Sequence, residues 1–448
     1  MNKKNTYYLL IAVFLAGTAF IFFRHRIKEN KNELSYYELL NRKGALAQTP
    51  EWAHTQTTVR NLYLSVANNP NDSKSALALA TIFIKEARIT GNFSYYDMAA
   101  MKQVNKVLEL DPNNFQALTY KALIYLSQHH FGDGLAIATK AQKINPYNSF
   151  IYGILVDANV EMGKYNDALS SADKMVSIRP DLRSYSRISY LREIYGDYPG
   201  AIAAMNLAVE AGMPGDDGTE WTRIQLGHLY ENTGNLDSAE FEYAQSLEYR
   251  KGFAPAISGL GHIAFVKKDY QKAIGYYQQA DTLVIDYTTK ENLAELYKIT
   301  GQNKKSDSLS SLVVESMSKD AAAAVGNDNI GHYVDRELSY AYLTVGQNEK
   351  ALEHALAEYN RRPDNIDVNE TLAWAYYKNN NVPKAINYMD VALRTNCKNP
   401  TLLSYAGIIY AKGGNKIKGK QLLTEAFKNN PGIDPELKTE SENVLKIL

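Results

Sequence analysis

The sequence predicts an all-α fold, a right-handed α–α superhelix (solenoid) of about ten helix–turn–helix repeats. Pro112, Pro146 and Pro180 are each 34 residues apart, and Gly227 and Gly261 share this spacing. The period equals the length of one helix–turn–helix unit, and self-similarity at such a period is typical of solenoids. Proline is also sparse, at 13 residues, which favours long helical segments.

Composition narrows the possible partners before any motif is considered. The 448 residues carry 49 Lys and Arg against 49 Asp and Glu, so the formal net charge is zero. Proteins that bind nucleic acid usually show a basic excess, so nucleic acid is not expected as a partner. The single cysteine, Cys397, excludes an intramolecular disulfide and a cysteine-based metal site.

Residues 1–30 differ from the rest of the chain and are predicted to form an N-terminal transmembrane anchor. Residues 7–23, YYLLIAVFLAGTAFIFF, contain no charged side chain and reach the roughly 17 residues that a membrane span requires. Tyrosines at one end and phenylalanines at the other suit the two membrane interfaces. A cleaved signal peptide is the alternative, but the apolar run continues past the small residues Gly17, Thr18 and Ala19.

The orientation of this span rests on two opposing signals. The short lysine-bearing N-terminal tail favours an N-terminus inside the cell, with the repeat array exported to the periplasmic side. More basic residues follow the span than precede it, which favours a cytoplasmic array by the positive-inside rule. We expect a single-pass membrane protein with an exported array, and the cytoplasmic side stays open as the alternative.

One residue pattern recurs along the chain, and its fullest copy is LGHLYENTGNLDSAEFEY, residues 226–243. It contains a Leu-Gly pair, a Tyr three residues after the Gly, a second Gly, an Ala, and a Tyr four residues further on. Copies of the pattern begin at Leu260, Leu293, Leu338, Leu372 and Ala406, and second halves of it begin at Gly163 and Gly196.

The pattern resembles the signature of the tetratricopeptide repeat family, W-x2-L-G-x2-Y…A-x3-F…P. The resemblance covers roughly residues 74–432 and implies paired helices that stack into a superhelix with a concave groove. The residues support this reading, because Leu226, Gly227 and Tyr230 share one helix face. Gly234 is expected to end its helix with a positive φ, and Pro112 and Pro180 follow the ends of second helices.

The repeats suggest an organisation into six segments. The anchor is followed by a helical lead segment that can be a degenerate repeat, a first part of the array, a linker or extended helix and loop, a second part of the array, and a C-terminal capping helix. These five segments span residues 31–73, 74–318, 319–331, 332–432 and 433–448.

No catalytic constellation is found, and an enzyme is not expected. The chain has no Walker A loop, no HExxH and no GxSxG. The pair His129-His130 suits a polar helix end better than a metal site, and Cys397 lacks a histidine partner for nucleophilic chemistry. Asp216-Asp217 offers too few ligands for calcium. No metal and no cofactor are expected.

The resemblance implies that a partner binds along the first helices, on the side turned away from the second helices. Aromatic and arginine side chains, which are enriched in binding hot spots, occur on this side. The same positions also suit packing between adjacent first helices. The predicted partner-binding residues are Asp157, Tyr190, Trp221, His228, Glu231, His262, Glu295, Tyr333, Arg336, Tyr340, Glu370, Trp374 and Tyr377.

The expected function is that of a membrane-tethered, non-catalytic scaffold that binds a peptide or helix of a partner protein. The alternative is an envelope accessory factor that presents a peptide or glycan substrate to a separate enzyme. The carboxylate clamp of the family needs Asn at set groove positions. This chain has Asp, Tyr, His, His, Glu, Tyr and Trp in that row, so such a clamp is not expected.

Overall fold

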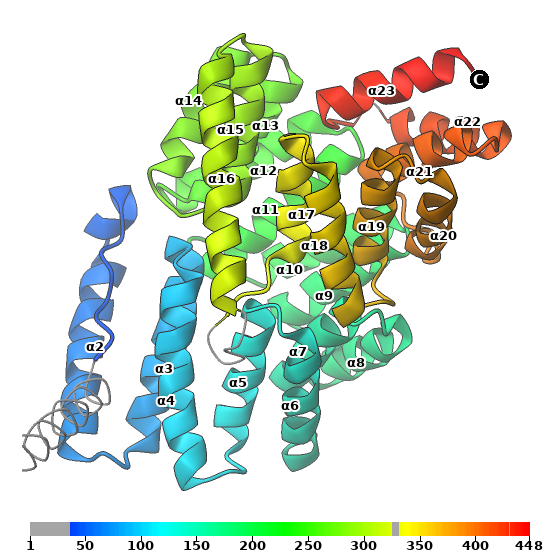
Figure 1. The fold of residues 1–448 in the computed structure, drawn as a ribbon. Coiled ribbons are helices and arrows are strands. Elements are labelled where there is room, and N and C mark those ends of the chain that lie inside the picture. Colours follow the sequence, from blue (N-terminus) through cyan, green and yellow to red (C-terminus); the bar gives the residue numbers. More distant parts are fainter. Residues whose placement is uncertain (1–35, 325–330, 430) are drawn as a thin grey trace, which may run out of the picture. The chain divides into compact units, whose positions relative to one another are not determined.

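The computed structural model describes residues 36–324, 331–429 and 431–448. The chain divides into two compact units, residues 1–41 and 42–448, and every described helix lies in the second. The described residues contain helices and no strand, so the predicted all-α superhelical array is confirmed (Figure 1). In chain order the helices are η1 Gly44–Gln48, α2 Pro50–Asn68, α3 Ser73–Thr90, α4 Phe93–Leu110, α5 Phe115–Ser127, α6 Phe131–Ile144, α7 Ser149–Glu161, α8 Tyr165–Ile178, α9 Leu182–Ile194, α10 Tyr198–Glu210, α11 Asp217–Asn232, α12 Leu236–Tyr249, α13 Ala254–Val266, α14 Tyr270–Asp281, α15 Tyr287–Ile299, α16 Asn303–Ala324, α17 Asp335–Thr344, α18 Asn348–Arg361, α19 Ile366–Lys378, α20 Val382–Ala392, α21 Pro400–Lys412, α22 Lys416–Phe427 and α23 Pro435–Lys446.

From α3 to α22 the helices pack as consecutive hairpins, α3 with α4, α5 with α6, and so on to α21 with α22. The odd-numbered helix of each pair is called its first helix and the even-numbered helix its second. First helices of adjacent hairpins touch from α3 through α13 and again from α17 through α21. The last helix, α23, packs on α21 and α22. The segment boundaries expected from the sequence stay predictions, and α16 continues to Ala324 within the expected linker.

Helix ends follow the local chemistry of the sequence. The predicted positive φ at Gly234 is confirmed, at 78°, and it lets the chain leave α11 in the left-handed conformation. Every first helix from α3 to α21 is followed by such a residue; in three of the turns it is His129, Lys268 or Asn380 instead of glycine. Most first helices also begin with an Asp or Asn whose side chain accepts a backbone N–H, as Asp181 does from Ser184.

Tyr243 packs three helices together near the middle of the array. Its ring is fully buried and lies against the backbone of Gly227 on α11 and Gly259 on α13. A Cβ added to Gly227 would lie 2.3 Å from Tyr243 Cε1, and one added to Gly259 would lie 2.8 Å from the same ring. Glycine is therefore required on both sides of this tyrosine, as the small-residue positions of the repeat pattern indicate.

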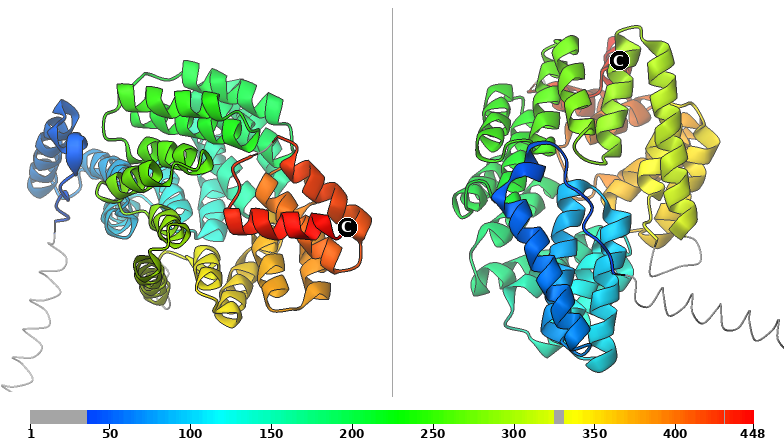
Figure 2. Two further views of the ribbon diagram at one scale, coloured as in Figure 1. Left: turned by 90° about the horizontal axis from the view of Figure 1, so that it is seen from above. Right: turned by 90° about the vertical axis from the view of Figure 1, so that its left-hand side faces the viewer.

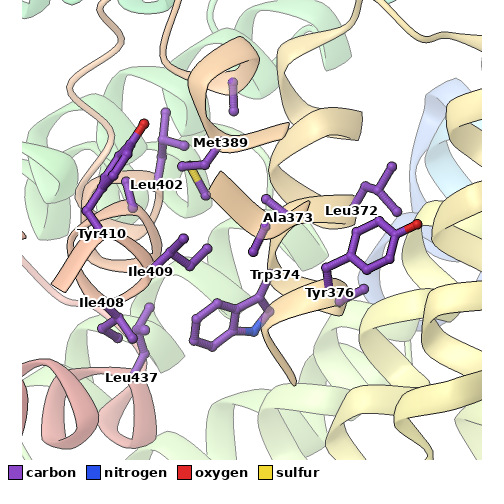
Figure 3. Packing of buried hydrophobic residues seen from close by; sticks show 14 of the residues in the cluster. Leu372, Ala373, Trp374, Tyr376, Met389, Leu402, Ile408, Ile409, Tyr410 and Leu437 are labelled. Carbon is purple, nitrogen blue, oxygen red and sulfur yellow. The ribbon is translucent and has the colours of Figure 1, made fainter. Parts of the chain in front are cut away.

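The C-terminal core shows how the last hairpins close. Leu372 of α19, Met389 of α20, Leu402 and Ile409 of α21, and Leu437 of α23 belong to one buried cluster with Trp374 (Figure 3). Each of the five aliphatic side chains is at most 5% exposed. α23 thus buries the apolar surface that a further hairpin would otherwise cover.

Residues about 200 positions apart touch, because the array turns back on itself (Figure 2). The Tyr165 hydroxyl accepts a hydrogen bond from the backbone N–H of Ile366, 201 residues later, at 3.0 Å. Asn365 Nδ2 donates to the carbonyl of Val160 at 3.2 Å. His129 Nδ1 lies 2.8 Å from the carbonyl of Tyr333, 204 residues later. One superhelical turn therefore takes about six repeats, and successive turns are in direct contact.

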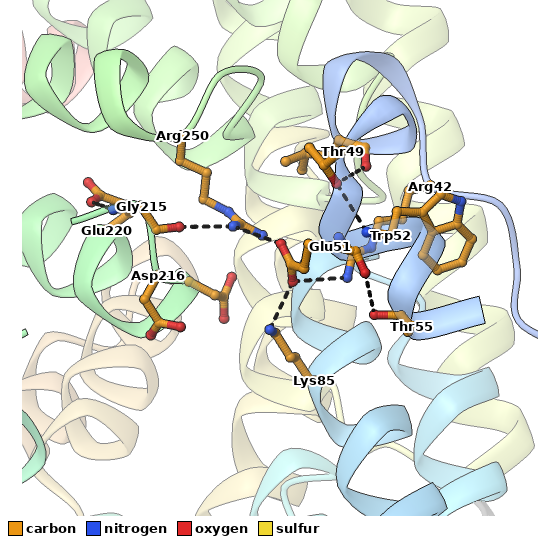
Figure 4. A network of polar contacts seen from close by, with 12 residues as sticks. Arg42, Thr49, Glu51, Trp52, Thr55, Lys85, Gly215, Asp216, Glu220 and Arg250 are labelled. Carbon is orange, nitrogen blue, oxygen red and sulfur yellow. Dashed lines mark hydrogen bonds and ion pairs between the residues drawn. The ribbon is translucent and has the colours of Figure 1, made fainter. Parts of the chain in front are cut away.

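A polar network makes the same type of contact at the start of the array (Figure 4). Glu51 of α2 pairs with Lys85 at 2.8 Å and with Arg250, 199 residues away, at 3.3 Å. Burial opposes ionisation of Glu51, but Lys85, Arg250 and Arg42 outweigh it and lower its pKa to about 2. Arg42 also pairs with the fully buried Glu86 at 2.6 Å. These charges join α2, α3 and the end of α12.

The predicted membrane anchor, residues 7–23, lies outside the described residues. Within residues 36–324, 331–429 and 431–448, no helix has the length and apolar character that a membrane crossing requires.

We predict that Gly227→Ala destabilises the array by about 1–3 kcal/mol, because the new methyl group overlaps the immobile ring of Tyr243. Gly275→Ala on α14 is the control, since nothing lies within 4 Å of its added Cβ. The control should stabilise the helix by roughly 0.5–1 kcal/mol. Urea unfolding followed by circular dichroism measures both changes, and an equal shift for the two variants would contradict the packing role of Tyr243.

Candidate functional site

Twelve of the thirteen predicted partner-binding residues lie on first helices, and Tyr333 lies just before α17. We call the surface that these thirteen residues define the first-helix face. Trp221 is 51% exposed and Tyr190 is 37% exposed, and His228 is also exposed. Glu231 and Trp374 are buried, and the other eight are half-buried.

Tyr190 and His228 combine solvent contact with crowding by protein. Burial raises the pKa of the Tyr190 hydroxyl well above its ordinary value, and burial lowers the pKa of His228. Both shifts require protein on most sides of the group, although solvent reaches each side chain. Tyr190 and His228 therefore lie at the surface with protein packed beside them.

The centre of the face is a cluster around Glu231, one turn after His228 on α11. Glu231 accepts a hydrogen bond from the hydroxyl of Tyr243 at 2.6 Å and pairs with Nδ1 of His262 on α13. Burial disfavours the charged form of His262, but Glu231 outweighs this and raises its pKa. Glu231 itself keeps a lowered pKa despite its burial, because His262 stabilises the carboxylate. Glu231 therefore links Tyr243, which packs the repeat, to the half-buried His262 on the next first helix.

Two other predicted residues have partners that the sequence did not reveal. Asp157 of α7 forms a bidentate ion pair with Arg187 of α9, with nitrogen–oxygen distances of 2.5 and 2.9 Å. Tyr333 stacks on His130 at 4.1 Å between ring centroids and lies under the guanidinium of Arg361 at 4.3 Å. Asp157 thus joins α7 to α9, and Tyr333 joins the start of α6 to α18.

Trp374 serves mainly in packing. Its ring stacks on Tyr405 of α21 at 4.1 Å and on Tyr377 at 4.9 Å, and only 6% of the residue is exposed. The Tyr377 hydroxyl donates to Glu440 of α23 at 2.7 Å. The C-terminal helix therefore covers this end of the first-helix face.

Arg336, Tyr340 and Glu370 form a third group, on α17 and α19. The guanidinium of Arg336 lies 5.7 Å from the centre of the Tyr340 ring, and the Tyr340 hydroxyl donates to Glu370 at 3.3 Å. Burial raises the pKa of Glu370 to about 7, and the charge of Asp367 adds to the shift. Burial likewise raises the pKa of Glu295 on α15, to about 9, with a further contribution from Asp434.

Five further side chains, not predicted from the sequence, share this surface. Each lies three or four positions from a predicted residue or stacks on one, so helical spacing alone would have found most of them. The missed residues are Glu161, Glu193, Glu291, Asp367 and Tyr405.

His130, Asp216 and Cys397, which the sequence offers as candidates for metal binding or catalysis, lie in structural settings. His130 Nε2 lies 2.8 Å from the carbonyl of Gly331, and Asp216 caps α11 by accepting from Gly218. Burial raises the pKa of the Cys397 thiol to about 12, so it holds its proton at neutral pH. Among the described residues, no group of three or more His, Cys, Asp or Glu side chains is placed to hold a metal ion.

Residues 222–253 match the family model of the tetratricopeptide repeat. The match covers most of the α11–α12 hairpin that Tyr243 packs, so this hairpin is similar to a tetratricopeptide repeat. The chain is thus an all-α superhelical repeat array with a hairpin of this type at its centre. No curated protein matches the sequence.

Solved structures of other repeat proteins are similar at low identity. A tetratricopeptide repeat protein from Parabacteroides merdae is 15% identical, with 54% of this chain and 92% of that chain covered and a TM-score of 0.42. Human IFIT1, solved as a dimer with PPP-AAAA, is 14% identical, with 77% of this chain and 79% of that chain covered and a TM-score of 0.48. The Cut9-Hcn1 hetero-tetramer of APC/C is 12% identical, with 90% of this chain and 94% of that chain covered and a TM-score of 0.38.

We predict that His262 titrates above its ordinary pKa of 6.5 and His228 below it. In Glu231→Gln the pKa of His262 should fall below 6.5, because burial then acts unopposed. Since the folded-state pKa of His262 is raised, its pairing with Glu231 stabilises the fold fully below pH 6.5 and less as pH rises through the folded value. NMR titration of the ring protons measures this, and an unchanged His262 in the variant would contradict the pairing.

Proposed function

We propose that this protein is a non-catalytic scaffold that binds a segment of a partner protein along its first-helix face. The observation that carries the proposal is the exposure of Tyr190, Trp221 and His228 on the first helices α9 and α11. Aromatic side chains are enriched at the centres of protein–protein interfaces, where they act as anchors. The tetratricopeptide repeat fold, which the family match supports, is typically a scaffold of this kind.

The exposed aromatics also fit no packing role. Trp221 keeps half of its surface in solvent, although Thr222 and Glu220 beside it are fully buried. Trp374, by contrast, is covered on both ring faces. Binding to a partner would therefore rest on the α9–α13 part of the first-helix face, where solvent reaches the side chains.

We predict that Trp221→Ala weakens capture of a cross-linked partner by roughly 10- to 100-fold, the usual loss for one aromatic anchor. Phe241→Ala is the matched control, because Phe241 is 59% exposed on the second helix α12. Quantitative cross-linking in the cells that make the protein measures both variants, and circular dichroism checks that they fold. Equal capture by Trp221→Ala and the wild type would contradict the assignment of the first-helix face as the partner-binding surface.

We also propose that residues 7–23 anchor the scaffold in a membrane, with the array on the exported side. The support is the uncharged apolar run, which is long enough to cross a bilayer. Protease added to intact cells and to spheroplasts tests the side. Cleavage of the array in spheroplasts only is expected for a periplasmic array. Protection in both would place the array in the cytoplasm instead.

A further inference from the structure

Four of the thirteen residues of the first-helix face are acidic and one, Arg336, is basic apart from the two histidines, although the chain as a whole is neutral. Glu161 of α7, Glu193 of α9 and Glu370 of α19 all feel the charge of Asp367. They meet because Asn365 and Ile366 bond to Val160 and Tyr165 in the contact between superhelical turns. Carboxylates from two successive superhelical turns therefore lie close together around Asp367.

A second group of carboxylates continues this surface. Glu291 and Glu295 lie on α15, Glu337 lies on α17, and Asp434 and Glu436 lie at the start of α23. Burial, together with the charge of neighbouring carboxylates, raises the pKa of Glu291 to about 7. Tyr405 joins the two groups, since the charges of Glu370 and Asp434 both act on its hydroxyl.

Few of these charges are balanced within the protein. Glu161 pairs with Arg362, and Glu436 pairs with Lys298. In the part of the chain that the structure describes, Glu193, Asp367, Glu370, Glu291 and Glu337 form no ion pair. The charges of Asp367 and Glu370 act on Arg336, but Arg336 forms no direct ion pair among the described residues. Its Nε atom, Glu295 Oε1 and Glu337 Oε2 are buried without a hydrogen-bond partner there.

Aromatic rings stand among the unbalanced carboxylates. Tyr190 is 37% exposed, lies one turn before Glu193 on α9, and feels the charge of Asp367. Carboxyl groups with raised pKa values are only partly ionised near pH 7, and a bound cation stabilises their charged form. Such groups, set beside an exposed aromatic ring, suit the ammonium of lysine and the guanidinium of arginine. An acidic peptide or a nucleic acid would be repelled from the same surface.

We propose that the partner segment bound along the first-helix face is cationic, an extended stretch of a partner protein rich in Lys and Arg. The inference rests on the proposed function and specifies its partner by charge complementarity. The carboxylates of α9 and α19 bind the basic side chains, and Tyr190 packs against their aliphatic stems.

The test uses the full chain in detergent and a fluorescein-labelled decapeptide of alternating Lys and Ser. Fluorescence polarisation should show binding that weakens at least tenfold when NaCl is raised from about 50 to 500 mM, because salt screens the charges. Asp367→Asn with Glu370→Gln should weaken binding at least tenfold. The control pair Asp173→Asn with Glu349→Gln makes the same change on the exposed second helices α8 and α18 and should leave binding unchanged.

Three outcomes would overturn the inference: equal weakening by the control pair, equal binding of a Glu-Ser decapeptide, or binding of spermine without binding of the lysine peptide. The inference and the proposed function fail separately. If Trp221→Ala abolishes partner capture while the Asp367 and Glu370 double variant keeps it, the scaffold stands and the cationic partner is wrong.

Discussion

The packing of Tyr243 between two glycines is the contact on which the centre of the array depends. The ring fills the space between Gly227 and Gly259, so α11, α12 and α13 approach as closely as their backbones allow. Its hydroxyl then holds Glu231, and Glu231 holds His262. One side chain thus fixes both the spacing of the repeats and the polar centre of the first-helix face.

The length of a superhelical turn decides which first helices face one another. Because a turn takes about 200 residues, the end of α7 meets the start of α19, where Asn365 bonds to Val160 and Arg362 pairs with Glu161. A superhelix with a different number of residues per turn would separate Glu161 from Arg362 and Asp367. The electrostatics of the face therefore follow from the geometry of stacking, which small rotations between hairpins accumulate.

Local pattern predicts the hairpins well because each contact within a hairpin is short in sequence. The left-handed turn at Gly234 and the small-residue and tyrosine positions all lie within one repeat. The role of Trp374 could not be predicted, since Tyr405 of the next hairpin and the tyrosine beside it cover its ring. The neutralisation of Asp157 by Arg187 depends likewise on the angle between α7 and α9, and the contacts between turns leave no periodic signal at all.

Glu193, Asp367 and Glu370 form no ion pair within the part of the chain that the structure describes, unlike Asp157, Glu161 and Glu231. Hairpin packing uses the opposite side of each first helix, where small and aromatic residues are required. Burial, with a further contribution from the charge of Asp367, raises the pKa values of Glu193 and Glu370, which means that their charged forms destabilise the folded state. Neutral polar residues would avoid this loss at the same positions. Side chains that lower the stability of the fold are typical of binding sites, where they are kept because they complement a partner.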